Sequence, residues 1–110
     1  MAFFGENGIH AWAQAYLNGT PDYRDAYNIS SVDDVGTGRI GFNFSVAAIN
    51  NDFAFVALSG NATGTTTSAR TINNDATVTS SYFAIRNLNT NNVNSVTDDS
   101  LINVIVVSNN

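Results

Sequence analysis

The chain has 110 residues, of which 44 % are hydrophobic and only 12 % are charged, and its formal net charge at neutral pH is -5. This length corresponds to one domain with a single core. The basic residues are 4 arginines scattered singly along the chain, so we do not expect binding to the phosphates of nucleic acid. The sequence has no cysteine, which excludes disulfides and thiolate metal sites.

Neither a membrane span nor an export signal is expected. No run approaches the roughly 20 apolar residues that a spanning helix needs. The first residues, MAFFGENG, lack the basic region of a secretory signal peptide, so we expect no export by the ordinary route. We interpret residues 1–8 as an N-terminal segment and residues 9–110 as a single domain.

Alternation of apolar and polar side chains predicts an all-β fold, an antiparallel β-sandwich of about seven short strands. The predicted strands are 9–17, 25–32, 39–46, 52–59, 68–72, 77–88 and 101–107. A helix is the alternative for the alanine-containing first stretch, but its period of two favours a strand. The stretch 25–46 is predicted to form a β-hairpin around a turn at 33–38, because glycine and aspartate interrupt the alternation there.

The connections are predicted to alternate between the two ends of the sandwich. On that basis the turn 33–38 and the long polar loops 60–67 and 89–100 share one end with the N-terminal segment. The loop 18–24 and the C-terminus are expected at the other end.

The strands at 52–59 and 101–107 are apolar on both faces. Half-exposed strands of antiparallel sheets are apolar on one face only, so this pattern predicts cover on both sides. The cover is either another part of the chain or a second copy of it.

No pattern of residues indicates catalysis. His10 is the only histidine and has no serine or cysteine context for a nucleophilic dyad. The acid pairs Asp33–Asp34 and Asp98–Asp99 lie in predicted turns, where aspartate is a favoured residue, and calcium binding with loop carbonyls is the alternative. We therefore expect no enzyme activity, no metal and no cofactor.

Trp12 and Tyr16 are predicted to share one face of the first strand with His10 and Gln14. Two interpretations remain open: a platform on which sugar rings stack, or aromatic packing at a subunit contact. The uncharged polar loops suit hydrogen bonding to a polysaccharide. The residues predicted to contact such a polymer are Tyr23, Asn61, Thr63, Thr65, Thr66, Asn89, Asn91 and Asn92.

The first half of the chain resembles a module found near the C-terminal ends of tailed-bacteriophage tail fibres. The resemblance is carried by AYNISSVDDVGTGRIGFNF at 26–44, preceded by Trp12, Asn18, Gly19, Thr20 and Arg24. The family pattern is A-W-x-x-(F/Y)-x-N-G, then an Arg, then F-N-(V/I)-S-S-V-x-D-x-G-x-G-x-(Y/I)-x-(V/F)-N-F. The end of the chain, 98–107, is similar to the closing strand of the module.

Two features depart from the family. The Pro-Asp-Ala-Asn-Tyr-like turn that follows the hairpin is replaced here by Ala48 to Phe53. Family members usually end long fibre polypeptides, whereas this sequence begins at Met1, so we expect it to attach non-covalently to its carrier. Phe3 and Phe4, with Trp12 and Tyr16, are the predicted anchor or subunit contacts.

The resemblance implies a virion protein, a homotrimer that contacts other virion proteins. The first hypothesis is a tail-fibre or knob-type tip module for host attachment, with a host surface glycan as ligand. The alternative is a capsid decoration protein that stabilises the head shell. A cellular carbohydrate-binding module is a third possibility, by analogy of fold alone.

Overall fold

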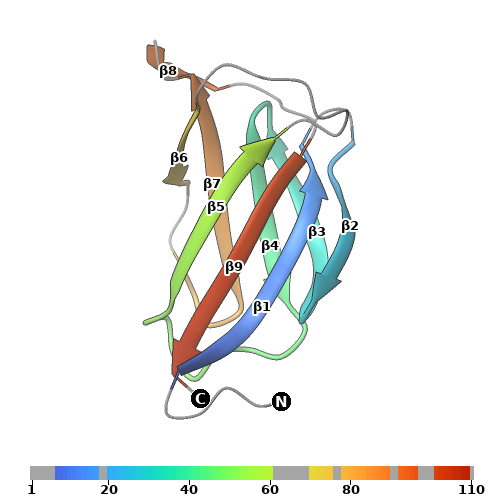
Figure 1. The fold of residues 1–110 in the computed structure, drawn as a ribbon, viewed down its shortest axis with the longest axis vertical. Coiled ribbons are helices and arrows are strands. Elements are labelled where there is room, and N and C mark those ends of the chain that lie inside the picture. Colours follow the sequence, from blue (N-terminus) through green and yellow to red (C-terminus); the bar gives the residue numbers. More distant parts are fainter. Residues whose placement is uncertain are drawn as a thin grey trace.

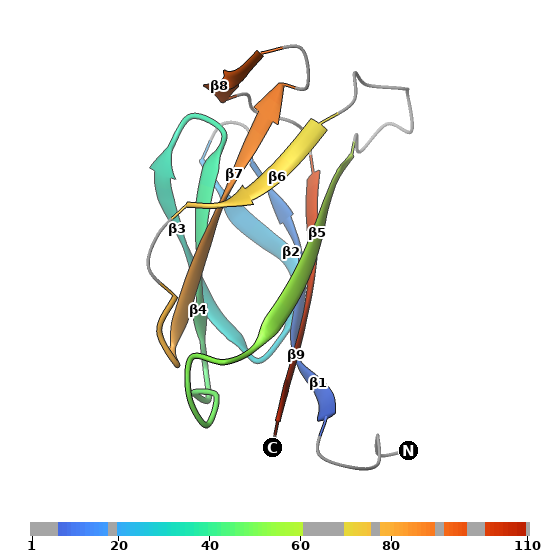
Figure 2. The same ribbon diagram turned by 90° about the vertical axis from the view of Figure 1, so that its left-hand side faces the viewer.

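Two antiparallel β-sheets packed face to face make up the molecule (Figures 1 and 2). The structure is a computed structural model that describes residues 7–17, 20–60, 70–75, 78–89, 92–96 and 101–109. These residues form nine strands and no helix, and therefore no helix that could cross a membrane. The predicted all-β sandwich is confirmed, with nine strands in place of seven.

The first sheet has the strand order β2-β1-β9-β5. Its strands are β1 (Asn7–Tyr16), β2 (Asp22–Tyr27), β5 (Ala54–Gly60) and β9 (Leu101–Asn109). Strand β1 buries small side chains, Ala11, Ala13 and Ala15, and exposes Trp12 and Tyr16. This alternation has the period of a strand, so the choice of a strand over a helix at 9–17 is confirmed.

The second sheet has the order β3-β4-β7-β6, with β8 paired to the end of β7. Its strands are β3 (Ile29–Gly36), β4 (Arg39–Phe44), β6 (Arg70–Asn74), β7 (Tyr82–Asn89) and β8 (Asn92–Val96). Strands β3 and β4 form the predicted hairpin, whose turn is shorter than expected because β3 continues to Gly36. Strand β8 lies within the stretch 89–100 that was predicted to be entirely loop, since its polar side chains show no apolar alternation.

The core lies between the sheets and pairs small side chains with large ones. The first sheet contributes mainly alanines and valines, and the second contributes phenylalanines and isoleucines. Phe42 and Phe83 stack with their ring centroids 5.0 Å apart, and Phe55 approaches Phe83 from the first sheet at 4.6 Å. Large rings facing small side chains allow dense packing between two layers.

The strand predicted at 25–32 is wrong, because two strands of different sheets meet there. Strand β2 pairs with β1 in the first sheet and β3 pairs with β4 in the second, and Asn28 lies between them. Its φ of 58° is in the left-handed region, which asparagine tolerates better than most residues. Residues 22–24, predicted as loop, consequently belong to β2.

The Asn28 side chain holds this corner in place. Its Oδ1 accepts a hydrogen bond from the Val46 N–H at 2.7 Å. Its Nδ2 donates to the carbonyl oxygens of His10 at 2.9 Å and of Val46 at 3.1 Å. One amide thus joins β1 of the first sheet to the segment that follows β4 of the second, where no strand ladder exists.

The additional strand changes which connections share an end. Asn7 pairs with Asn109 at one end, which we call the terminal pole. At the opposite end, the loop pole, lie the β3–β4 turn and the pairs Gly60↔Leu101 and Arg70↔Asn89 (Figure 1).

The strand ends that flank the three predicted loops therefore do share one end. However, β1 begins at the terminal pole, so the prediction that the N-terminal segment lies beside these loops is wrong. The junction of β1 and β2, marked by the pair Tyr16↔Asp22, lies at the loop pole for the same reason. Because the predicted strand 25–32 is in fact two strands, the chain segments before it lie at the opposite end of the sandwich from the predicted one.

We expect Asn28→Gly to lower the free energy of unfolding by about 2–3 kcal/mol, because it keeps the backbone conformation but leaves carbonyl and amide groups of Val46 and His10 without their partner. The control is Asn51→Gly, an exposed loop asparagine, which should cost less than about 1 kcal/mol. Urea unfolding measures both. Equal effects of the two substitutions would show that the Asn28 amide does not hold the corner.

Candidate functional site

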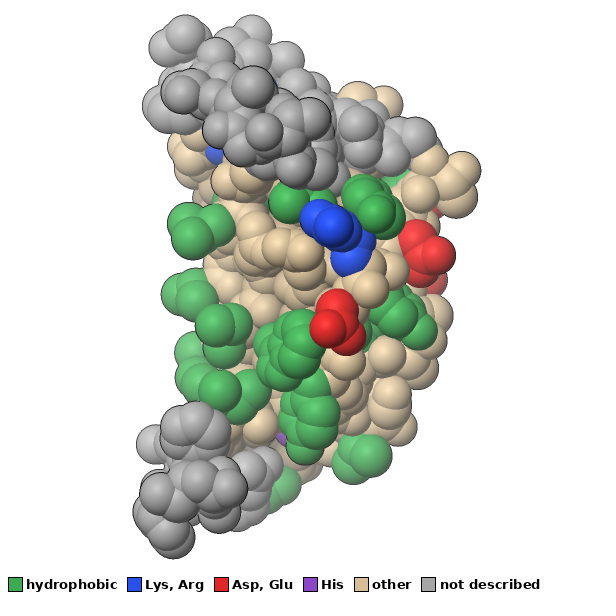
Figure 3. Space-filling view, turned by 45° about the vertical axis from the view of Figure 1, so that its right-hand side comes forward, with side chains coloured by type: hydrophobic (Ala, Val, Ile, Leu, Met, Phe, Trp, Pro, Cys, Tyr) green, Lys and Arg blue, Asp and Glu red, His purple; other side chains and the backbone are tan. Residues whose placement is uncertain are grey.

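The outer face of the first sheet carries a row of apolar side chains that crosses all four strands. Trp12 of β1 pairs with Tyr27 of β2 on one side and with Ile105 of β9 on the other. Ile105 in turn pairs with Val56 of β5. All four side chains are exposed. Figure 3 shows hydrophobic side chains gathered on this face, beside a few charged ones.

A polar row lies next to the apolar one. Gln14 pairs with Asp25 of β2 and with Asn103 of β9, and its Nε2 donates to the Asn103 Oδ1 at 2.9 Å. A shallow groove of about 350 Å³ runs between the rows and is lined by Trp12, Ile105 and these three polar residues. The Asp25 Oδ1 accepts a hydrogen bond from the Ala26 N–H at 2.9 Å, which leaves the other carboxylate oxygen for a ligand.

This arrangement supports two kinds of contact. A flat indole ring beside a carboxylate and two amides offers a stacking surface with both donors and acceptors, which fits the face and hydroxyls of a sugar. The same exposed apolar row also fits packing against another protein surface. The groove is thus a candidate binding site of either kind, and neither acid–base nor nucleophilic chemistry is grouped in it.

Trp12 and Tyr16 lie on one face as predicted, but His10 does not. A β-bulge between Ile9 and Ala11 turns His10 inward, where its ring packs edge-on against Phe44 at 4.7 Å. The His10 Nε2 lies 3.2 Å from the Asn28 Nδ2. His10 is a packing residue.

Tyr16 and Tyr23 have different surroundings. The Arg24 guanidinium lies 5.7 Å from the Tyr16 ring centroid, a cation–π distance. Tyr23 is exposed, but it belongs to β2 and not to a loop. It pairs with the inward-facing Ala15, so it does not join the row of Trp12 and Tyr27.

The other predicted contact residues lie outside what the structure describes, in whole or in their side chains. Asn89 and Asn92 are described only by their backbone pairing between β7 and β8. The residues outside the described ranges are Phe3, Phe4, Asn61, Thr63, Thr65, Thr66 and Asn91, with the acid pair Asp98–Asp99. Their predicted roles stay predictions.

Sequence reasoning missed part of this face. Asp25 and Asn103, which lie on strands remote in sequence, were not identified as groove residues. Val56 and Ile105 were anticipated only as members of strands apolar on both faces. That signal was informative: the inward residues of β5 pack on the core, and the outward ones are exposed within the single chain.

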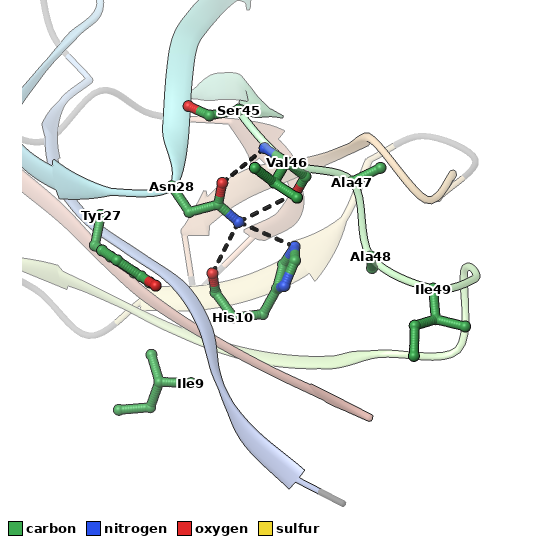
Figure 4. A pocket seen from close by; sticks show the side chains of 9 residues that line it. All are labelled: Ile9, His10, Tyr27, Asn28, Ser45, Val46, Ala47, Ala48 and Ile49. Carbon is green, nitrogen blue, oxygen red and sulfur yellow. Dashed lines mark hydrogen bonds between the residues drawn. The ribbon is translucent and has the colours of Figure 1, made fainter. Parts of the chain in front are cut away.

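A second cavity, of about 480 Å³, opens at the terminal pole (Figure 4). Its walls combine aliphatic side chains with polar groups, among them the Asn28 amide. This amide already bonds to Val46 and His10 on all sides shown in Figure 4. The Asn28 amide is therefore a structural group of this cavity wall.

The outer face of the second sheet carries a cluster of ion-paired side chains. Asp75 has a side chain only 1 % exposed, and it forms ion pairs with Arg39 (Nε–Oδ2 3.0 Å) and Arg86 (Nη2–Oδ1 2.6 Å). Its N–H donates to the Ala84 carbonyl oxygen at 2.8 Å. Two guanidinium groups and the backbone thus hold this carboxylate, which makes the cluster structural.

The acid pair at the hairpin lies on a strand. Asp33 and Asp34 lie in β3 and not in the turn, and the Asp33 Oδ1 accepts a hydrogen bond from the Asn43 Nδ2 at 3.2 Å. Across the part of the chain that the structure describes, no group of three or more potential metal-ligating side chains occurs.

Comparisons of the chain with protein-family models, with curated proteins and with solved structures find no match. The tail-fibre resemblance therefore rests on the sequence pattern alone.

The surroundings of Tyr82 shift the pKa of its hydroxyl. Burial raises the pKa of its hydroxyl above the ordinary value, the charges of Asp33 and Asp75 raise it further, and Arg39 opposes them. The ring lies across β4 at Gly41, where a Cβ would come within 2.6 Å of the Tyr82 Cζ.

We expect Tyr82 to ionise above the ordinary pKa of tyrosine, because burial and two carboxylates disfavour its charged form. Its contribution to stability is complete below about pH 10, where tyrosine ionises in an unfolded chain. Above that pH the unfolded state loses the proton first, so the free energy of unfolding falls until the folded Tyr82 ionises. Absorbance titration of wild type and Tyr82→Phe tests this. Loss of an early-titrating tyrosine in the variant would contradict it.

Proposed function

We propose that the chain is a bacteriophage virion protein, a tail-fibre or knob-type tip module that takes part in host attachment as a homotrimer. The sequence support is the hairpin pattern at 26–44, which resembles tail-fibre modules. In the structure these residues form the Asn28 corner and the β3–β4 hairpin, a well-defined unit of the fold.

The observation that carries the proposal is the separation of the two poles. The molecule is 39 Å along its longest axis, which is vertical in Figure 1 and joins the poles. Strand β1 begins and β9 ends at the terminal pole. Attachment through the segment before β1 would place the terminal pole at the particle and turn the loop pole outward.

The sequences that connect the strand ends at the loop pole suit contact with a polar polymer. The sequences between β5 and β6 and between β7 and β9 are rich in asparagine and threonine, and their charged residues are Asp98 and Asp99. Asparagine and threonine side chains provide many donors and acceptors without electrostatic preference. The groove at Trp12 adds an aromatic surface on the side of the module. A host surface glycan is therefore the ligand class that we propose.

The second candidate is a capsid decoration protein. The observation that favours it is the exposed apolar row on the first sheet, since a cement protein needs a broad adhesive face toward the shell. In this case the face of the sheet, and not a pole, would point to the particle.

Gold-labelled antibodies against the protein, viewed on intact particles by electron microscopy, separate these functions. We expect label at the tips of tails or appendages. Label distributed over the head would replace attachment by decoration, and particles without label would contradict both. A pre-immune serum on the same particles is the control.

Deletion of residues 2–4 gives a second test, of the orientation. We expect the shortened protein to be lost from purified particles, because Phe3 and Phe4 are the proposed anchor. Alanine in place of residues 6–8, which keeps both rings, is the matched control and should be retained. Full retention of the deleted form would show that the protein attaches by another surface.

A further inference from the structure

The four outer strands of the two sheets differ in how their free edges are protected. Natural edge strands carry charges, bulges or prolines, or are very short, which prevents pairing with other chains. Strand β2 contains Asp22, Arg24 and Asp25 together with a bulge. Strand β3 contains Asp33 and Asp34 and has two register shifts. Strand β6 has only 5 residues.

Strand β5 has none of these protections. Its 7 residues, AFVALSG, include no charge and no proline. Its register with β9 runs from Ala54 to Gly60 without a shift, so the strand is regular to its end. Among the described strands it pairs with β9 alone. An unprotected edge of this kind is a liability for a chain that stays single, and it indicates that something covers it.

The outward side chains of β5 continue the apolar character onto β9. Val56 is 69 % exposed and Leu58 is 72 % exposed. Ala54 pairs with Val107 and Val56 with Ile105, so the five side chains form one connected surface. We call this surface the β5 strip; it consists of Ala54, Val56, Leu58, Ile105 and Val107.

Charge indicates what covers the β5 strip. The chain has a net charge of -5, so two copies repel each other unless they meet where acids are absent. The strip contains no charged residue, and its contact with an identical strip buries no unpaired charge. The outer face of the second sheet, with Asp75, Arg39 and Arg86, offers no such contact.

We propose that three copies of the chain meet through the β5 strip, with Val56, Leu58 and Ile105 of each copy directed to a three-fold axis parallel to the long axis of the molecule. This arrangement keeps all terminal poles at one end and all loop poles at the other. It buries the exposed side chains of the β5 strip in all three copies. The inference rests on the proposed homotrimer and adds the surface that forms it.

Matched charge substitutions test the contact. Val56→Asp and Leu58→Asp place a carboxylate in the strip, while Val46→Asp and Ile49→Asp place one at side chains that are equally exposed, 68 % each, at the terminal pole. Sedimentation velocity across a range of concentrations gives the stoichiometry. We expect trimers for the wild type and for both control variants, and monomers for both strip variants, a loss of at least tenfold in affinity.

Far-ultraviolet circular dichroism and thermal unfolding of the same samples check that every variant folds. Should either Asp variant unfold, Val56→Thr keeps the shape of valine and adds a hydroxyl to the strip, and it should raise the trimer dissociation constant. A monomeric or dimeric wild type, or strip variants that remain trimers, would overturn the proposal.

Cross-linking locates the contact independently of affinity. The natural sequence has no cysteine, so Leu58→Cys and Ile49→Cys each introduce a single thiol. A short bis-maleimide should link copies of the Leu58→Cys protein and leave the Ile49→Cys protein as single chains. The reverse pattern would overturn the proposal. These measurements use purified protein, so they can fail while particle labelling supports attachment, or succeed while it does not.

Discussion

The arrangement of the fold depends on the amide of Asn28. At this residue the chain leaves one sheet and enters the other, in a left-handed conformation that breaks the strand. The side chain then supplies hydrogen bonds that a ladder would otherwise have made, to Val46 and to the carbonyl of His10. Because of this break, β2 and β3 are two strands in place of one. As a result, β1 begins at the end of the sandwich opposite to the β3–β4 turn. The orientation argument for host attachment follows from that single residue.

The two sheets use their outer faces differently. On the second sheet, Tyr82 lies across Gly41, and Arg39 and Arg86 hold the buried carboxylate of Asp75, so these groups bind one another within the chain. On the first sheet, the small alanines of β1 point inward and its aromatic side chains point outward. A chain that needed only a stable core would place the large side chains inside. The outward Trp12 and Val56 are the side chains on which the proposed contacts beyond the single chain depend.

Much of the fold could be predicted from alternation alone. The strands at 9–17, 39–46 and 101–107 and the hairpin turn follow from period-two patterns and glycine positions, which are local signals. What failed depends on contacts between distant residues. Asn28 bonds to residues 18 positions away on either side, and the bulge that turns His10 inward interrupts the alternation without a residue to mark it. The groove likewise joins Gln14 to Asn103, 89 positions later.

The two interpretations of the first sheet occupy different halves of it. The β5 strip lies on β5 and β9, and the polar groove lies on β9, β1 and β2, with neighbouring strands about 4.8 Å apart. A three-fold axis beside β5 would bury Val56 and leave Trp12, Gln14 and Asp25 at the rim of the contact, open to solvent. A glycan could then stack on Trp12 beside the subunit interface. Subunit packing and sugar binding are alternatives at Ile105, where the halves meet, but they are compatible across the rest of the face.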